Sequence, residues 1–262
     1  MVKFQINDKQ YQTPEGWHEV TFDKFLLSLT ELDEKRPMSL NKFLEEHIKA
    51  VGGIDDKLSD IAKETEALRL FEERWEIIPS NEKVKCHKFF SISVGFWCGI
   101  PSELIREAMN LNELEQTFWT IEYELNPNHA EIDEEWTGFK LNGVEYLPPM
   151  KHMEESTVIE FAESAQFQEN MKEVEGGNWL AMLDVMVVLC RPKGEIYDYQ
   201  KGKHERRKKV FKHVTMNHVI NTAFFLLRLN RILKHNLLIY TMGQELERKA
   251  HGRLATDTDG LM

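Results

Sequence analysis

Apolar and polar residues alternate in two short stretches of the chain, FQINDKQYQTP from Phe4 and FKLNGVEYLPP from Phe139. Alternation that is interrupted by Asn-Asp or Asn-Gly is typical of a β-hairpin with a tight turn. Asn142-Gly143 is the better turn, because Asn and Gly tolerate the positive φ angles of a type I′ turn. We therefore expect strands at Phe139–Leu141 and Val144–Leu147, and a similar pair after Phe4.

The two stretches align with a constant offset of 139 − 4 = 135 residues. The matched positions are Phe4, Ile6, Asn7, Tyr11 and Pro14 against Phe139, Leu141, Asn142, Tyr146 and Pro149. Each proline is expected to end its second strand, because proline cannot donate to a ladder. Thr21 and Thr157 then precede similar apolar patterns and are predicted to cap helices. We interpret this as a duplication of hairpin and helix; two unrelated hairpins are the alternative.

Apolar residues at three- and four-residue steps predict helices through most of the first half. Gly52-Gly53 and Gly99 are expected to end helices, and Pro101 to begin one. The stretch Phe71–Ile78 fits either a continued helix or a strand. The predicted helices are Glu19–Leu32, Ser39–Val51, Asp55–Leu70, Glu82–Cys98, Ser102–Met109 and Asn112–Leu125.

The second half repeats the order of hairpin and helices after an acidic connector, Asn126–Trp136. Helices are predicted at Asn178–Cys190 and Met216–Tyr240, Asp198–His213 as part loop and part helix, and the tail from His251 as unordered without a partner. The pattern as a whole predicts a predominantly α-helical α+β protein. Its two related halves are residues 1–130 and 131–262, each a β-hairpin followed by helices.

Composition narrows the classes of function. The 262 residues include 42% hydrophobic residues, which is typical of a folded protein. The formal net charge of −11 disfavours nucleic-acid binding over the whole surface. We expect no signal peptide and no membrane span, because the apolar runs are shorter than the roughly 20 residues that a span needs. Three dispersed cysteines indicate synthesis in a reducing cytoplasm rather than a disulfide framework.

No catalytic, cofactor or metal-binding template fits the sequence. Phosphate-binding glycine loops and His or Cys pairs at zinc-ligand spacing are missing. Cys98 and Cys190 each end an apolar run and are interpreted as small buried residues. Cys86 is expected to be more exposed, with His87 and Lys85 lowering its pKa. We predict no enzymatic activity, no cofactor and no metal.

One basic segment stands out in this acidic chain. It is compatible with nucleic acid, with an acidic partner surface, or with a solvated helix face that pairs with the acidic first half. Partner or internal pairing is favoured, because aromatic residues are not interleaved with the cations as in base-stacking surfaces. The segment contains Lys201, Lys203, His204, Arg206, Arg207, Lys208, Lys209, Lys212 and His213.

Four short motifs carry a family resemblance: Pro14-Glu15-Gly16-Trp17-His18-Glu19-Val20-Thr21, Cys98-Gly99-Ile100-Pro101, Asn142-Gly143 before Tyr146, and Leu189-Cys190-Arg191-Pro192. With the order of hairpins and helices, they resemble small proteins of phages that infect Bacteroidetes and related hosts. Such proteins are labelled tail assembly chaperones or uncharacterised virion components. Cysteine stands here at two positions where the family has Thr or Tyr.

The resemblance implies a non-enzymatic role in bacteriophage morphogenesis, as a tail assembly chaperone or a virion structural component. The implied partners are other tail or virion proteins, with self-association open, and the implied location is the host cytoplasm or the virion. Exposed hairpin edges could add a partner strand, unless the two hairpins pair with each other. The expected partner-binding residues are Phe4, Ile6, Tyr11, Phe139, Leu141 and Tyr146. The alternative function is a nucleic-acid-associated factor that uses the basic run 201–213.

Overall fold

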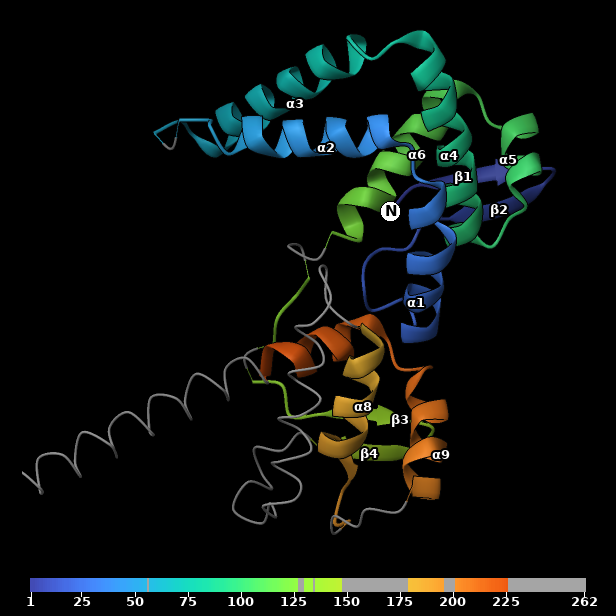
Figure 1. The fold of residues 1–262 in the computed structure, drawn as a ribbon, viewed down its shortest axis with the longest axis vertical. Helices are drawn as coiled ribbons and strands as arrows, with labels where there is room; N and C mark the ends of the chain where they lie inside the picture. Colours follow the sequence, from blue (N-terminus) through green and yellow to red (C-terminus); the bar gives the residue numbers. More distant parts are fainter. Residues whose placement is uncertain (56, 127–129, 134, 148–178, 196–200, 226–262) are drawn as a thin grey trace, which may run out of the picture. The chain divides into compact units, whose positions relative to one another are not determined.

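The computed structural model describes all of the chain except residues 56, 127–129, 134, 148–178, 196–200 and 226–262. The described chain is mostly α-helical and carries two small antiparallel sheets (Figure 1). This confirms the predicted predominantly helical α+β class. The predictions for Pro149, for a helix capped by Thr157, for residues 226–240 and for the C-terminal tail lie outside the described residues.

The chain folds into two compact units. Unit 1 consists of Met1–Glu131 together with Lys201–Asn217, and unit 2 of Ile132–Gln200 together with His218–Met262. The sequence predicted a single boundary at residue 130, with 201–217 in the second half. The placement of 201–217 differs because backbone hydrogen bonds join this segment to the first helix of unit 1.

Unit 1 combines one β-hairpin with a series of helices. The predicted helices of the first half are present, and the ambiguous stretch is helical from 71 to 76. The elements are β1 (Lys3–Ile6), β2 (Lys9–Gln12), α1 (Phe22–Glu31), the 3₁₀ helix η1 (Asp33–Lys35), α2 (Met38–Val51), α3 (Asp60–Glu76), α4 (Ser80–Cys98), α5 (Ser102–Ala108), α6 (Leu111–Glu124) and α9 (Lys201–Phe211).

The first hairpin has the predicted two-residue turn. Asn7 and Asp8 connect β1 to β2 with positive φ angles of 46° and 63°, as a type I′ turn requires. Phe4 and Tyr11 lie opposite each other on the paired strands, and their rings stack at 5.9 Å between centroids. Pro14 follows shortly after β2 ends, as expected.

The core of unit 1 is centred on α4. Phe90 is fully buried and its ring stacks on Phe118 of α6, with centroids 3.9 Å apart. Gly95 lies where the chain after the helix passes close by, so a Cβ there would meet the carbonyl oxygen of Ile100 at 2.5 Å. Gly99 ends the helix with a φ of 70°, in the left-handed region that favours glycine. The predicted role of Gly99 is confirmed.

Residues 201–217 are joined to the start of α1 by backbone hydrogen bonds. Thr21 caps α1, as predicted, and its side chain accepts from the third residue after it. The amide of Phe22 donates to Val214 O at 2.8 Å, and the amide of Met216 donates to Val20 O at 2.7 Å. All four partners of these two bonds are buried, so the segment completes the core of unit 1.

Unit 2 contains β3 (Phe139–Leu141), β4 (Val144–Leu147), α8 (Trp179–Leu189) and β5 (Arg191–Pro192), and residues 218–225 are helical. Asn142 and Gly143 form the predicted turn, with φ angles of 50° and 81°. The sheet order is β3-β4-β5, separate from β1-β2. The alternative that the two hairpins pair into one sheet is therefore wrong. The short strand β5, which follows α8 directly, takes the place beside β4 instead.

Candidate protein-binding surface

The helices α2 and α3 form a hairpin that extends from α4 and α6 (Figure 1). Aromatic rings anchor its base: Phe43 of α2 lies 5.1 Å from Phe71 and 5.3 Å from Trp75, and Phe71 lies 4.9 Å from Trp119 of α6, between centroids. Beyond this cluster the described residues of the hairpin are half-buried or exposed. Leu40 and Phe43 are the buried residues of α2, and no residue of α3 is buried along its described length.

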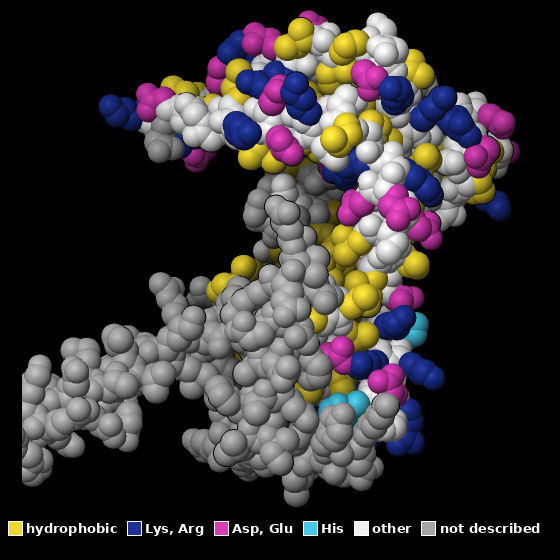
Figure 2. All heavy atoms as spheres, viewed as in Figure 1, with side chains coloured by type: hydrophobic (Ala, Val, Ile, Leu, Met, Phe, Trp, Pro, Cys, Tyr) yellow, Lys and Arg dark blue, Asp and Glu magenta, His cyan; other side chains and the backbone are white. Residues whose placement is uncertain are grey.

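Large apolar side chains on this hairpin face solvent. Ile61 is 78% exposed, Ile48 69% and Leu68 59%. Ile61 and Leu68 are seven residues apart, which places them on one stripe of α3. Figure 2 shows apolar side chains here among charged ones. Single exposed apolar residues are ordinary, but a concentration of them on one element is typical of a protein-binding surface. The others are Met38, Leu58 and, just after α3, Ile77.

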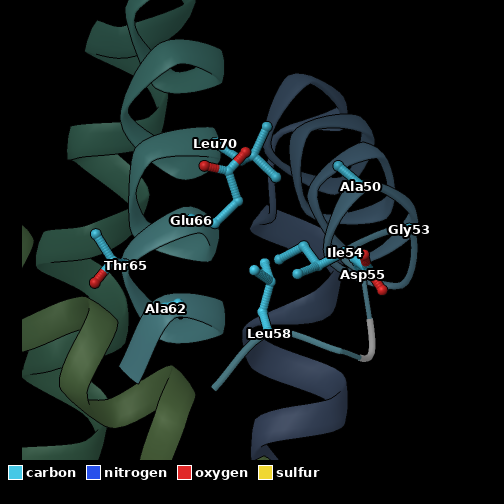
Figure 3. Close-up of a pocket in the computed structure, with 9 residues that line it drawn as sticks. All are labelled: Ala50, Gly53, Ile54, Asp55, Leu58, Ala62, Thr65, Glu66 and Leu70. Atoms are coloured by element: carbon cyan, nitrogen blue, oxygen red, sulfur yellow. The ribbon is translucent and has the colours of Figure 1, made fainter. Parts of the chain in front are cut away.

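A groove of about 590 Å³ lies between the two helices near their connection. In Figure 3 the side chains of Ile54, Leu58, Glu66 and Leu70 point into the space between the helices. The small side chains on both helices leave this space open. Apart from Thr65 and two carboxylates, the lining is apolar or glycine: Ala50, Gly53, Ile54, Leu58, Ala62 and Leu70, with the carboxylates of Asp55 and Glu66.

The hairpin carries an excess of negative charge. Residues 38–76 contain ten acidic and six basic residues, a net charge of −4. On α3 the guanidinium of Arg69 contacts Glu66 at 2.6 Å and also pairs with Glu73, so one cation serves two carboxylates. Asp55 accepts from the backbone amide of Lys57 at 3.0 Å. The hairpin is therefore net negative, and the two charged residues that line the groove, Asp55 and Glu66, are both acidic.

His47 lies within the aromatic base of the hairpin. Its ring stacks on Phe43 with centroids 6.2 Å apart and meets Phe71 edge-on at 5.4 Å. Its Nδ1 is buried without a hydrogen-bond partner in the described structure. Burial lowers the pKa of His47 below its ordinary value, and the nearby Arg74 guanidinium lowers it further. The neutral imidazole is therefore the form that suits this site.

The hairpin residues that were predicted to bind a partner belong to two different units, and half of them serve the cores of those units. Phe139 also stacks on His218 at 5.2 Å within unit 2. Ile6, Phe139 and Tyr146 are buried, while Phe4, Tyr11 and Leu141 are half-buried.

The predicted basic patch is partly engaged inside the protein. Lys212 pairs with Asp23 of α1 at 3.3 Å, which is the internal pairing with the acidic first half that the sequence left open. Lys208 pairs with Glu205 at 3.6 Å, and Arg207 is buried. Lys203 is half-buried, while Arg206 and Lys209 are exposed.

The expectation for Cys86 was wrong. Its side chain is fully buried, with Sγ 3.8 Å from the hydroxyl of Ser39, because this face of α4 packs against α2. Burial raises the pKa of the Cys86 thiol instead of lowering it. Burial also raises the pKa of Cys98, to about 11. Neither of these two thiols has the lowered pKa of a reactive cysteine. Cys190 is buried, as predicted.

One small polar group was not predicted from the sequence. Single ligand atoms of Glu15, His18 and Glu19 lie within 4.8 Å of one another, and all three side chains are exposed. The spacing Glu-x-x-His-Glu in the sequence could have indicated this group. The group borders a polar pocket of about 130 Å³ that Trp17 and Glu124 also line. Exposed groups of this kind are common without an ion.

No helix in the described part of the chain combines the length and apolar character needed to cross a membrane.

No protein-family model, curated protein or solved structure matches the chain.

Proposed function

We propose that this chain is a non-enzymatic assembly protein that acts through protein–protein contacts, and that the α2–α3 hairpin is its contact surface. The observation that carries this proposal is the group of exposed apolar side chains on a hairpin whose buried residues, within the described chain, lie at its base. Exposed apolar surface on a projecting helical element is a liability for a protein with no partner. A partner that covers Ile48, Ile61 and Leu68 would remove this apolar surface from water.

The assignment to phage morphogenesis rests on the sequence motifs alone. On that interpretation the partner is a tail or virion protein, the chain acts in the host cytoplasm, and it either leaves the partner after assembly or stays in the virion. A chaperone that shields an apolar segment and a structural component that docks permanently both need a surface of this kind. The two roles differ in whether the chain is found in finished particles.

The basic segment supports the alternative function less well. Arg206 and Lys209 are exposed, but Lys212 and Lys208 have acidic neighbours within unit 1. Nucleic-acid binding needs several cations to reach phosphates at once, and its affinity falls steeply with salt. A binding partner whose recovery falls steeply between low and high salt, and that nuclease removes, would favour this alternative.

The test is site-specific photo-crosslinking from the hairpin. A photoreactive phenylalanine analogue replaces Ile61 or Leu68 in cells that make the assembly proteins of the phage, and crosslinked products are identified by mass spectrometry. The control position is Leu111 of α6, which is also apolar and 51% exposed but lies outside the hairpin. We expect one defined assembly protein to be captured from both hairpin positions and not from Leu111.

Two results would contradict the proposal. One is equal capture from Leu111, which would mean that any exposed apolar position reports the same neighbours. The other is no capture from either hairpin position while the particles assemble normally. Copy number in purified particles then separates the two roles, since a structural component is present at many copies and a chaperone is absent.

A further inference from the structure

The groove between α2 and α3 has the form of a site for a helix. It lies between the end of α2, the connection that follows it and the first turns of α3. Its apolar lining comes from Ala50 of α2, from Ile54 and Leu58 of the connection, and from Ala62 and Leu70 of α3. In Figure 3 the larger side chains point into the space between the helices. Its volume of about 590 Å³ falls within the range of about 300–1,000 Å³ that is usual for ligand sites. Two packed helices offer no free strand edge, so an extended peptide would find no backbone partners.

The charge of the α2–α3 hairpin indicates which kind of helix could bind in the groove. Within the described chain the cation that contacts Glu66 is Arg69, which Glu73 shares, and the hairpin has four more acidic than basic residues, ten against six. An anionic helix or a nucleic acid would be repelled by this excess. A helix with basic residues beside its apolar stripe would place its cations near the carboxylates of Asp55 and Glu66 that line the groove.

A second copy of the described chain does not supply such a helix. Its basic helix is α9, where Phe211 is fully buried and Val210 is half-buried, so α9 has no exposed apolar stripe to fill the groove. The occupant must carry both features on one face, namely apolar residues at i, i+3 or i+4, and i+7, with Lys or Arg beside them.

We propose that the groove formed by α2 and α3 binds a cationic amphipathic helix of the partner protein. This rests on the proposed function and names the chemistry of the partner segment. Ile54, Leu58 and Leu70 receive the apolar side chains of the bound helix. Asp55 and Glu66 face its cations. Electrostatic complementarity of this kind gives the contact its orientation and a dependence on ionic strength.

The test uses the full chain and two synthetic probes. One probe is an 18-residue helical peptide of Leu and Lys in amphipathic order, and the other has Glu in place of every Lys. We expect the Lys probe to bind and to weaken as salt is raised from about 0.05 to about 0.3 M, where the Debye length becomes much shorter. The Glu probe should bind about tenfold more weakly or not at all.

Matched variants locate the binding. Ala62→Arg fills the groove with a cationic side chain on a helix that tolerates Arg, and Gln116→Arg adds the same charge to α6, away from the groove. We expect Ala62→Arg to weaken binding of the Lys probe about tenfold or more, and Gln116→Arg to change it less than about twofold. Circular dichroism of both variants checks that the helices are retained.

Three results with the probes would overturn the inference. They are equal binding of both probes, no binding of the Lys probe, and binding that Ala62→Arg leaves unchanged. If the chain alone self-associates and Ala62→Arg prevents it, the occupant is a second copy and the inference is again wrong. Partner capture from Ile61 together with failure of the Lys probe would overturn this inference but leave the proposed function standing. If the hairpin positions capture no partner and the Lys probe does not bind, the proposed function is contradicted as well.

Discussion

Gly95 shows how a single residue sets the geometry of the core of unit 1. The loop after α4 returns so closely that the carbonyl oxygen of Ile100 lies 2.5 Å from the place of a Cβ on residue 95. This contact is with backbone, which cannot rotate away as a flexible side chain can. The absence of a side chain at residue 95 therefore decides how α4 and α5 meet.

We expect Gly95→Ala to lower the free energy of unfolding by about 1–3 kcal/mol, because the added methyl overpacks a buried contact. Gly202→Ala on α9 is the matched control, since a Cβ there meets nothing within 4 Å. That variant should be neutral or more stable, by about 0.5–1 kcal/mol, as alanine favours a helix over glycine. Urea denaturation of both variants measures the difference. Equal effects of the two substitutions would show that the close contact is unimportant.

His47 couples the base of the α2–α3 hairpin to pH. Its pKa is lowered in the folded protein, first by burial and then by Arg74. In the unfolded chain the imidazole has its ordinary pKa of about 6.5, so the unfolded state binds more protons as pH falls below that value. Stability should therefore decrease as pH falls from 7 through the lowered pKa, and this loss should stop below it.

We expect His47→Gln to flatten this part of the stability curve, because glutamine does not titrate. His18→Gln is the control, since His18 is an exposed histidine of the same unit. His218 in unit 2, whose pKa is also lowered by burial, should leave a remaining slope in the variant. Denaturant unfolding at several pH values between 5 and 8 measures it. Identical slopes for wild type and His47→Gln would contradict the assignment.

At the level of elements, the hairpin turns follow local chemistry. Asn142 and Gly143 both have positive φ angles, and nothing lies within 4 Å of a Cβ placed on Gly143. The requirement there is one of backbone conformation and not of space. The same holds at Asn7-Asp8, where both residues also have positive φ angles. Each turn was predictable because its chemistry is contained within two residues.

Gly143→Val should destabilise the hairpin β3–β4 by about 1–2 kcal/mol, since a β-branched residue is strained in the left-handed region. Gly143→Asn, which tolerates that region, should cost clearly less. Thermal unfolding of each variant measures the loss, and the part of the near-ultraviolet signal that the Trp136→Phe background removes reports this sheet, since Trp136 and Tyr146 both stack on Phe139. If Gly143→Asn lowers the stability as much as Gly143→Val, the positive φ angle of the turn is not the cause of the loss.

The α2–α3 hairpin differs from the turns, because its proposed function depends on what does not pack against it. Both helices were predicted from their apolar periodicity, and that periodicity also predicts a buried face. The buried face covers only the aromatic base, while Ile48, Ile61 and Leu68 remain exposed. Periodicity cannot distinguish an apolar residue that meets its own core from one that meets another protein.

For the molecule as a whole, the main organisational feature is that unit 1 is not a continuous segment. Its contribution from Lys201–Asn217 is held by backbone hydrogen bonds to Val20 and Phe22 and by the pair Asp23–Lys212. Phe211 and Val214 of this segment are buried. A fragment that ends at Glu131 therefore lacks part of its own core.

We expect the fragment 1–131 to melt at a lower temperature than the same fragment joined by a flexible linker to 201–217. Losing large buried side chains costs about 2–5 kcal/mol each, and exposed amides at the start of α1 add to this. Circular dichroism gives the melting temperatures, and hydrogen exchange at Phe22 tests the lost backbone bond. If both forms melt at the same temperature and the Phe22 amide stays protected from exchange, residues 201–217 are not part of the folding unit.

Features whose causes are local could be predicted from the amino-acid order. They are the type I′ turns, the cap at Thr21, the end of α4 at Gly99 and the helical class, because each follows from the backbone preferences of a few adjacent residues. The burial of Cys190 was also predictable, since it ends an apolar run, although Cys98, which ends another, is only half-buried. The continuation of α3 through 71–76 was not, because the periodicity of that short stretch fits both a helix and a strand.

Which segments meet was settled by the folded structure and not by local pattern. The fold pairs β4 with β5, buries Cys86 against α2, brings 201–217 to α1, and leaves the far part of α2–α3 uncovered with a groove between the helices. These outcomes depend on residues that are distant in the chain, and hydrophobic burial is non-directional, so an apolar pattern does not specify its partner. The candidate surface is therefore a property of the fold, whereas its residues are ordinary members of two amphipathic helices.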